Sequence, residues 1–446
     1  MTGRVGIVGA GISGLVLHRM LRQYGIETVV FEAHEDPGGV IRSRRIDGRV
    51  LESGPQRVRM TPTVAELVDD LALTDQVIVA NDQPLFVYYD GTLCETPLSP
   101  RAALRTDLLS WWGKARVLLE PFVGGPPRAG ETVAEYLERA FGTEFAARFA
   151  GPLYAGLYGS DPTMMPVEHS LMRAFDRMRI DGSVLRWAIR RQLRGRTPPP
   201  VISFVDGLQT LPARIVGCHP AGLRFGEPVT GIERTDRGYR LRTAAGIEPV
   251  DTVVLTVPAG TAAQLLEAVA PTASKALAQL TYHPLATVHL ATTEWDRSGS
   301  GHTIPLSEGL LTRGVTWNGS LFGDLQDGSR MGIYTCFLGR AGRTSIETVS
   351  ADELGRRART EFETVTATDA SIMNVDRMLP GMPAYDHTWN ALEQVDLPDR
   401  LVLCTNYTDR AGIPGRIAAA TELAATLAAD KSINGYTRQP DPACRS

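Results

Sequence analysis

The stretch that decides the fold is VGIVGAGISG, at residues 5–14. It opens with a short apolar run at residues 5–8, and residues 15–21 follow with apolar side chains at helical spacing. The change of spacing around a glycine-rich turn predicts a strand, a turn and a helix. A helix that starts directly after such a turn offers its free N–H groups and its positive dipole end to an anion.

The turn itself, GAGISG, has glycines at the spacing that a dinucleotide requires. Gly9 allows a tight turn, Gly11 lets the backbone approach a pyrophosphate, and Gly14 lets the helix pack closely against the strand. Ile12 and Ser13 complete the turn. We therefore predict that these five residues cradle the phosphates of a dinucleotide.

A second strand and an acidic residue complete the pattern. Residues 28–31 are TVVF, and this β-branched run ends in Glu32, 18 residues after Gly14. A carboxylate at that position accepts hydrogen bonds from ribose hydroxyls and repels a 2′-phosphate. Glu32 and the adjacent Ala33 are predicted to contact the nucleotide. The motif is a βαβ unit, and it leaves NAD and FAD open as cofactors.

The composition is that of a folded protein with ordinary charge. The chain has 446 residues, of which 43% are hydrophobic, and this length predicts two or three domains. A formal net charge of -4 provides no basic stripe, so nucleic acid is not predicted as a partner. The five cysteines and eight histidines have no metal-ligand spacing, so no metal is predicted. Scattered cysteines favour a reducing compartment, the cytoplasm.

Hydrophobic spacing divides the rest of the chain into helical and strand-like regions. Residues 98–200 have helical spacing, interrupted by two segments rich in glycine and proline. Residues 229–257 predict a hairpin, with its turn at 236–238, and then a buried strand. Short runs between residues 285 and 340 predict an antiparallel sheet, and residues 401–405 predict a last strand before a helix.

Residues 173–196 carry eight arginines together with apolar residues at helical spacing. The pattern predicts one basic amphipathic helix. Such a helix suits contact with anionic lipid or with a carboxylated substrate. It also suits a solvent-exposed face, where the aliphatic parts of the arginine side chains cover the core. Both interpretations stay open, and so does peripheral contact with a membrane.

Seven segments beyond Glu32 form an ordered set. The first is EDPGGVIRS, at residues 35–43. The others are LESGPQRVR at 51–59, GLYGSDP at 156–162, VDGLQTLPARI at 205–215, VVLTVPA at 253–259, MPAYDHTW at 382–389 and NYTDRAGIPGRIAAA at 406–420. In content and order they resemble the FAD-containing amine oxidase superfamily, specifically its protoporphyrinogen oxidase branch. The resemblance spans nearly the whole chain and implies FAD as the cofactor.

The resemblance assigns cofactor contacts to residues outside the first turn. Gly38 and Gly39 would approach the FAD pyrophosphate, and Val229 would meet the adenine end through its backbone. A turn before a helix that begins near Gly415 would lie beside the isoalloxazine ring. The further residues that would line the cofactor are Arg42, Ser43, Gly54, Pro55, Gln56, Ala411, Gly412, Ile413 and Pro414.

The resemblance also implies an α/β fold, α+β overall, with a Rossmann-like FAD-binding domain of the glutathione-reductase and amine-oxidase type. A substrate domain with an antiparallel sheet and a helical insertion would accompany it. The implied boundaries are 1–75, 201–262 and 380–432 for the FAD-binding domain, 76–97 and 263–379 for the substrate-binding domain, 98–200 for the helical insertion and 433–446 for a flexible tail.

The activity that the resemblance implies is oxidation of a small molecule, coproporphyrinogen III or protoporphyrinogen IX, to the porphyrin with dioxygen as acceptor. Tyr385 and His387 match family positions near the substrate and are the candidate catalytic residues. Mitochondrial and plastid members have an arginine where Leu85 precedes the segment FVYYDG. This departure favours coproporphyrinogen, the more carboxylated substrate. The candidate partners for its carboxylates are Arg57, Arg59 and Arg101.

Two other functions stay open. A flavin amine oxidase or desaturase acting on a specialised metabolite would fit Leu85, and it would fit residues 418–420, where alanines replace the family's serine and glycine. A protein that binds flavin without turnover, as a partner or carrier, would fit the same cofactor motif.

Overall fold

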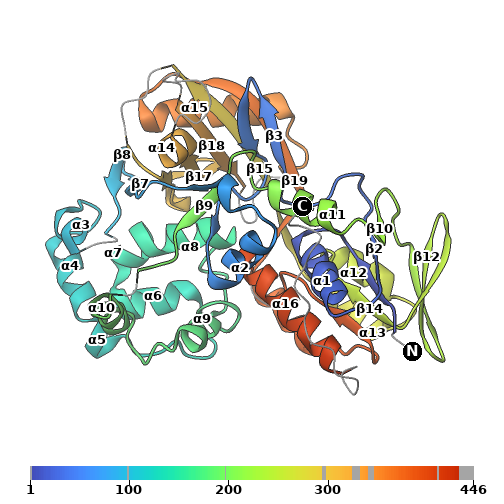
Figure 1. The fold of residues 1–446 in the computed structure, drawn as a ribbon. Helices are drawn as coiled ribbons and strands as arrows, with labels where there is room; N and C mark the ends of the chain where they lie inside the picture. Colours follow the sequence, from blue (N-terminus) through green and yellow to red (C-terminus); the bar gives the residue numbers. More distant parts are fainter. Residues whose placement is uncertain are drawn as a thin grey trace. The chain divides into compact units, whose positions relative to one another are not determined.

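The computed structural model describes residues 3–97, 100–195, 197–293, 298–323, 332–339, 346–408 and 411–430 (Figure 1). Contacts between residues group the chain into two compact units. The first unit comprises Met1–Val79, Pro199–Leu280 and Asn390–Ser446, and the second comprises Ala80–Pro198 and Thr281–Trp389. The tail predicted at residues 433–446 lies outside the described residues.

The first unit is built on a five-stranded sheet with the order β10-β2-β1-β14-β20. All of its strand pairs are parallel. The strands are β1 (Val5–Val8), β2 (Thr28–Phe31), β10 (Leu223–Arg224), β14 (Thr252–Leu255) and β20 (Leu401–Leu403). Every residue of β1, β2 and β14 is buried, as expected for a parallel sheet covered on both faces. The predicted βαβ unit is confirmed, with α1 (Ile12–Gln23) between β1 and β2.

Helices and smaller sheets surround this sheet. The helix α1 packs against α16 (Ile413–Ala429) and against α11 (Thr210–Cys218). The predicted hairpin is confirmed as β11 (Gly231–Thr235) and β12 (Gly238–Thr243), which a further strand, β13 (Gly246–Val250), extends. The remaining elements of the unit are β3 (Ser43–Ile46), β4 (Arg49–Glu52), β5 (Val58–Arg59), α2 (Pro62–Asp70), η1 (Thr74–Gln76), β6 (Val77–Val79), β9 (Val201–Phe204), α12 (Ala259–Leu266) and α13 (Pro271–Leu277).

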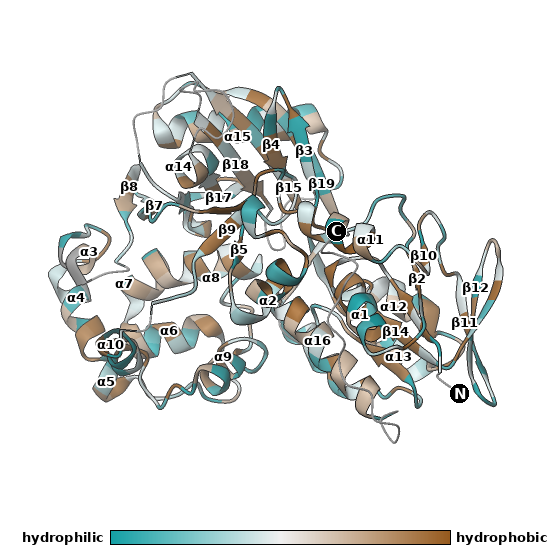
Figure 2. Cartoon of the chain, viewed as in Figure 1, coloured by the Kyte–Doolittle hydropathy of each residue, from teal (hydrophilic) through white to brown (hydrophobic). Residues whose placement is uncertain are grey.

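The second unit contains a seven-stranded sheet with the order β19-β15-β18-β17-β16-β7-β8. Its strands are β7 (Leu85–Tyr89), β8 (Thr92–Glu95), β15 (Tyr282–Thr292), β16 (Gly301–Thr303), β17 (Thr312–Trp317), β18 (Gly332–Leu338) and β19 (Ser371–Pro383). The predicted antiparallel pairing holds for every neighbouring pair but one, since β16 runs parallel to β7. Figure 2 shows hydrophobic colour along β17 and β18, and α15 (Ala351–Thr366) packs against β15, β18 and β19.

The region predicted to be helical forms a group of short helices in the same unit. They are α3 (Pro100–Arg105), α4 (Trp111–Leu118), α5 (Glu120–Val123), α6 (Val133–Phe141), α7 (Thr143–Phe145), η2 (Ala146–Ala150), α8 (Gly151–Tyr158), η3 (Val167–His169), α9 (Leu171–Met178) and α10 (Val184–Leu193). The boundaries predicted for three domains stay a prediction. Residues 263–280 group with the parallel sheet, and residues 380–389 group with the second unit.

The prediction of one basic helix over residues 173–196 is wrong. The structure has two helices there, α9 and α10, with a break between them. Arg179 ends α9 in the left-handed conformation, at φ +52°, and the side chain of Ser183 caps α10 by accepting a hydrogen bond from Arg186 N. Arg196 lies outside the described residues.

Candidate functional site

The glycine turn lies where β1 passes into α1. Gly9 has φ +107° and its N–H donates to Phe31 O over 2.7 Å, which holds the turn against the end of β2. A Cβ at Gly14 would lie 2.0 Å from Gly9 O, so the close approach of helix and turn requires glycine there. A Cβ at Gly11 would meet nothing within 4 Å. The chain itself therefore leaves open space beside Gly11, at the N-terminus of α1.

Glu32 lies beside this turn because β1 and β2 are adjacent parallel strands. Its side chain is buried, and both carboxylate oxygens accept backbone N–H groups. Ala10 N donates to Oε2 over 2.8 Å, and His34 N donates to Oε1 over 3.0 Å. These bonds fix the carboxylate at the carboxyl edge of the sheet, where the ribose of a dinucleotide is expected. Ala33 is exposed next to it.

A second pair of glycines lies against the first turn. Gly38 N donates to Ala10 O over 2.9 Å, and Gly38 forms a parallel bridge with Gly11. Gly38 and Gly39 both have positive φ, +109° and +62°, and a Cβ at Gly39 would lie 3.4 Å from Gly11 Cα. Two stretches of bare backbone thus meet beside the open space at Gly11. A phosphate group needs such an approach to backbone N–H groups.

The polar residues that follow are bonded within the first unit. Arg42 Nε donates to Gly39 O over 3.1 Å, which stabilises the second glycine turn. Ser43 Oγ donates to Glu52 Oε2 over 2.8 Å and accepts a hydrogen bond from Gln209 N, so this hydroxyl has a structural role. Glu52 Oε1 accepts a hydrogen bond from Leu208 N, and burial raises the pKa of this carboxyl to about 7.

The segment Gly54, Pro55 and Gln56 is packed tightly. A Cβ at Gly54 would lie 1.9 Å from Val40 O, so only glycine fits. Gln56 is buried, and its Nε2 donates to Glu52 O and Gly54 O, which turns the side chain back onto its own segment. Pro55 is half-buried.

Val229 has a property that suits the contact predicted for it. Its side chain is buried, and within the described part of the chain neither its N–H nor its carbonyl forms a hydrogen bond. The neighbouring Thr230 N donates to Arg242 O, so pairing with β12 begins one residue later. A backbone N–H and carbonyl that no other described residue pairs can bind an outside partner, such as the edge of an adenine ring.

The second helix start at this site is that of α16. The sequence predicted a helix near Gly415, but α16 begins at Ile413, with Pro414 in its first turn, where proline is well tolerated. Gly412 precedes it with φ +80°, and a Cβ there would meet nothing within 4 Å. Ala411 is exposed.

Arg416, in the first turns of α16, is not among the residues predicted for the site. Its guanidinium is buried, donates through Nε to Ser13 Oγ over 3.0 Å, and bonds to Thr405 O through Nη1. Ser13, predicted to touch the cofactor, thus ties α1 to α16 through its hydroxyl. Arg416 lies in residues 406–420, one of the segments that resemble the family. The resemblance indicated that this segment lies near the flavin, but it did not indicate that Arg416 bonds to Ser13.

Two of the predicted substrate residues belong to the second unit and are packed or exposed. Tyr385 is buried, stacks on Trp389 with ring centroids 4.3 Å apart, and meets the Tyr158 ring edge-on. His387 is exposed at the start of η5 (His387–Gln394). Leu85 begins β7 and is half-buried. These contacts give Tyr385 a packing role.

The arginines predicted to bind carboxylates differ in their surroundings. Arg57 is half-buried, and burial followed by the nearby charge of Arg59 lowers the pKa of its guanidinium. Arg59 is exposed, and its Nη1 donates to Pro199 O over 3.1 Å. Arg101 lies in α3, and its side chain is outside the described part of the structure.

These features fit FAD in the first unit: an open space beside bare backbone, two uncapped helix starts, an anchored acid and an unbonded backbone at Val229. Comparison with known proteins decides the family. The chain matches the family described as "Flavin containing amine oxidoreductase" over residues 12–425. The chain belongs to this family. This flavin-containing oxidoreductase is therefore an enzyme with FAD as its cofactor.

Relatives of this amine oxidoreductase include porphyrinogen oxidases. Chloroplastic protoporphyrinogen oxidase of Oryza sativa subsp. japonica is 28% identical over 384 residues, which cover 78% of this chain and 72% of the relative. Coproporphyrinogen III oxidase of Mycobacterium tuberculosis (strain CDC 1551 / Oshkosh) is 28% identical over 448 residues, which cover 93% and 95% of the two chains.

Solved structures support the same fold for this amine oxidoreductase. A protein from Exiguobacterium sp. 255-15, provisionally named protoporphyrinogen oxidase, matches with a TM-score of 0.79 and 22% identity, over 96% of this chain and 99% of its own. Cyclohexylamine oxidase from Brevibacterium oxydans IH-35A matches with a TM-score of 0.71 and 17% identity, over 97% and 100% of the two chains. At these identities the likeness shows the fold alone.

Two features are absent from the described part of the chain. Among them, no helix combines the length and the apolar character that crossing a bilayer requires. No group of three or more histidine, cysteine, aspartate or glutamate side chains in the described ranges could hold a metal ion.

Proposed function

We propose that this enzyme dehydrogenates a porphyrinogen to the porphyrin, with dioxygen as acceptor, and that coproporphyrinogen III is preferred over protoporphyrinogen IX. One relative is named protoporphyrinogen oxidase and another coproporphyrinogen III oxidase, and both names support oxidation of a porphyrinogen. The surroundings of Arg57 support the more carboxylated substrate. FAD would supply the acceptor for the hydride, and we propose that the residues predicted for the cofactor site hold it.

Arg57 carries the substrate argument. It follows directly on Gln56, in the loop between β4 and β5, and it is half-buried. Within the described residues no carboxylate and no hydrogen-bond acceptor contacts its guanidinium, whose pKa burial lowers. A half-buried guanidinium loses part of its hydration, and no acceptor among the described residues replaces it, so an anionic ligand would be favoured there.

Other arginines of the first unit differ from Arg57 because they contact acceptors within the chain. Arg19 is fully buried, and its Nη2 lies 3.1 Å from Asp70 Oδ2. Arg224 pairs with Glu248 at 2.5 Å, and Arg416 donates to Ser13 and Thr405. The fold thus gives these cations acceptors of its own. A planar guanidinium suits bidentate contact with a carboxylate, such as the propionate of a coproporphyrinogen.

The chain's own residues would hold the reacting partners in place. The N–H groups at the starts of α1 and α16 would bind cofactor oxygens, and Glu32 would bind the ribose hydroxyls. Arg57 would orient the substrate through a carboxylate. The sequence's candidates Tyr385 and His387 stay predictions, and we assign no proton transfer to them.

The function is tested by anaerobic titration of the purified holoenzyme with coproporphyrinogen III. Bleaching of the flavin bands together with the appearance of porphyrin absorbance is the expected result. Flavin bands that stay oxidised with both porphyrinogens, while air-driven porphyrin formation does not exceed autoxidation, would exclude the proposal.

The role of Arg57 is tested separately by Arg57→Leu. Loss of a hydrogen-bonded ion contact of about 1.5 to 3 kcal/mol would raise KM for coproporphyrinogen roughly 10- to 100-fold, with a smaller effect on kcat. Arg45→Leu is the matched control, because Arg45 is exposed and paired with Asp206 at 2.5 Å. Equal KM values for the two variants would show that Arg57 does not bind the substrate. That result would not bear on the proposal that the enzyme oxidises a porphyrinogen.

The second candidate is a flavin amine oxidase or desaturase acting on a specialised metabolite. Leu85, half-buried at the start of β7, favours it, because no cation stands there for a propionate. Reduction of the flavin by an amine, with no reduction by either porphyrinogen, would establish this alternative. A cytoplasmic location stays a prediction.

A further inference from the structure

One side of α10 presents apolar and cationic side chains together. The side is formed by five residues at positions i, i+3, i+4, i+7 and i+8, which lie along one stripe of a helix. They are Arg186, Ile189, Arg190, Leu193 and Arg194, and we call them the α10 stripe. All five are exposed, Ile189 by 55% and Leu193 by 83%. In an ordinary surface helix, apolar residues at this spacing face the core.

The other contacts of α10 hold the helix in place. Trp187 Nε1 donates to Met178 O over 3.1 Å, which ties α10 to the end of α9. Glu120 of α5 is fully buried and accepts hydrogen bonds from Ser183 Oγ over 2.6 Å and from Val184 N over 2.8 Å. The α10 stripe is therefore the solvent side of an anchored helix.

An aromatic ring of α5 lies near the first arginine of the stripe. Arg186 donates to Pro121 O, and the next residue, Phe122, is 84% exposed. The helices α5 and α10 pack against each other. Large apolar side chains that gather on an exposed face indicate a site for a ligand or partner.

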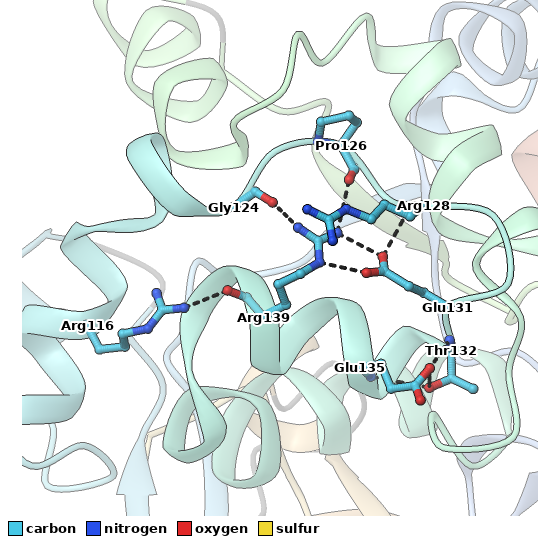
Figure 3. Close-up of polar contacts among 8 residues, drawn as sticks. All are labelled: Arg116, Gly124, Pro126, Arg128, Glu131, Thr132, Glu135 and Arg139. Atoms are coloured by element: carbon cyan, nitrogen blue, oxygen red, sulfur yellow. Dashed lines mark hydrogen bonds and ion pairs between the residues drawn. The ribbon is translucent and has the colours of Figure 1, made fainter.

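Arginines of the neighbouring helices have acceptors within the chain, as Figure 3 shows. Arg139 of α6 bonds to Gly124 O and pairs with Glu131 at 2.6 Å. Arg116 of α4 donates to Arg139 O over 2.5 Å. These guanidinium groups hold α4 and the end of α5 against α6, so they serve the fold.

The arginines of the α10 stripe have no carboxylate of this kind. Residues 184–194 contain no aspartate and no glutamate. Among the described residues, no carboxylate pairs with Arg186, Arg190 or Arg194. Glu120, the acid bonded to the start of α10, is fully buried and already accepts hydrogen bonds there. The stripe therefore presents positive charge alone, interleaved with apolar side chains.

We propose that the α10 stripe and Phe122 bind the oxidised product, a planar aromatic porphyrin that carries carboxylate side chains. This inference rests on the proposed function, which supplies a ligand of that chemistry. The apolar face of the macrocycle lies against Ile189, Leu193 and Phe122, and its carboxylates accept hydrogen bonds from the guanidinium groups. A porphyrinogen, whose saturated bridges let the ring bend, makes poorer contact with the same face.

Charge and spacing favour this ligand over other occupants. Successive arginines of the stripe are four residues apart, which is about 6 Å along the helix axis. Carboxylates distributed around the rim of a macrocycle can therefore meet more than one guanidinium, whereas a ligand with a single carboxylate cannot. A second copy of this chain is disfavoured, because a two-fold contact would bring the same arginines face to face.

Equilibrium dialysis of the holoenzyme with coproporphyrin III tests the ligand. One matched ligand is a porphyrin with cationic pyridinium groups, which keeps the macrocycle and reverses the charge. The other is dodecanoate, which keeps a carboxylate and an apolar chain without the macrocycle. We expect both to bind about tenfold more weakly than coproporphyrin or worse, and coproporphyrin binding to weaken at about 1 M salt. Equal binding of either matched ligand overturns the proposal.

Paired variants locate the site. Arg190→Glu with Arg194→Glu, and separately Ile189→Ser with Leu193→Ser, should each weaken coproporphyrin binding about tenfold or more. Melting temperature and flavin content check that each variant is folded. Binding equal to wild type in folded variants would refute the α10 stripe as a porphyrin site.

The controls make the same changes on exposed side chains of the first unit. They are Arg237→Glu with Arg240→Glu, and Val79→Ser with Ile247→Ser. Both controls should bind coproporphyrin like wild type, and a loss as large as in the stripe variants would overturn the assignment.

Flavin reduction by porphyrinogen in the wild-type enzyme separates this inference from the proposed function. Reduction together with unchanged binding in the stripe variants refutes the site and leaves the function. Binding that only the stripe variants lose, without any flavin reduction, supports the site and refutes the function.

Discussion

The Nε atom of Arg416 donates a hydrogen bond to Ser13 Oγ over 3.0 Å, although the two residues are 403 positions apart in the chain. Arg416 is in the first turns of α16, and Ser13 is in the first turn of α1. The bond joins the two helix starts that the cofactor is proposed to use. A buried guanidinium thus links the two helix starts, in addition to the packing of α1 against α16.

Replacing this guanidinium should destabilise the first unit. Arg416→Leu leaves Ser13 Oγ without this donor and leaves Thr405 O with the Thr408 hydroxyl in place of two donors, and we expect a loss of about 3 kcal/mol in the free energy of unfolding. Denaturant titration followed by flavin absorbance measures it. Arg22→Leu, an exposed arginine of α1, should change stability by less than about 0.5 kcal/mol. Similar values for the two variants would contradict this role.

Two glycine substitutions should have different effects, one on the stability of the fold and the other on FAD binding. Gly14→Ala places a Cβ 2.0 Å from Gly9 O and should cost about 3 kcal/mol of stability, with or without flavin. Gly11→Ala meets nothing in the chain, and φ -70° suits alanine, so its apoprotein should melt like wild type and bind FAD far more weakly. Melting curves of both apoproteins and their flavin content separate the cases. Normal flavin content in Gly11→Ala would place the pyrophosphate elsewhere.

Glu32→Gln should weaken FAD binding. Both carboxylate oxygens accept N–H groups, so an amide would turn a donor towards Ala10 N or His34 N. With one charge-assisted contact also lost, the Kd for FAD should rise about tenfold or more. Fluorescence quenching of added FAD gives the Kd. Glu35→Gln, a change to an exposed neighbour, should leave it unchanged, and equal values for both variants would argue against the ribose role.

The buried carboxyl of Glu52 predicts a pH dependence of stability. Burial raises its pKa from 4.5 to about 7, so the folded state binds the proton more tightly than the unfolded state. Its contribution is complete below the unfolded pKa and is lost as the pH rises through about 7, which amounts to about 3 kcal/mol. Glu52→Gln should lack this fall. Denaturant midpoints of both proteins at about pH 4.5 and about pH 8 give the comparison, and parallel pH profiles would contradict it.

Local patterns predicted the elements that need no distant partner. An apolar run before a glycine turn predicted the strand at residues 5–8, and a β-branched run predicted the strand at 28–31. Alternating residues on either side predicted the turn at 236–238. The break between α9 and α10 was missed although Gly182 and Ser183 are ordinary signals of a turn and a helix cap. The helical spacing of apolar residues continues across this break and hides it.

Contacts between distant segments could not be predicted. Nothing near Arg416 in sequence points to Ser13, and nothing near Glu52 points to Leu208 N, because such partners are set by packing of the whole unit. The same limit applies to Ile189 and Leu193 of α10. Apolar side chains at helical spacing predict burial, and only the fold shows that this stripe faces solvent.

The parallel sheet also constrains how the protein is made. Its central strand, β1, is followed soon in the chain by one neighbour, β2, but the other neighbour β14, the edge strand β20 and the covering helix α16 come some 250 to 400 residues later. During synthesis one edge of β1 therefore waits without its native partner, exposed to mispairing with other nascent chains. We therefore expect chaperones to protect the growing chain. We also expect FAD to bind only after the chain leaves the ribosome.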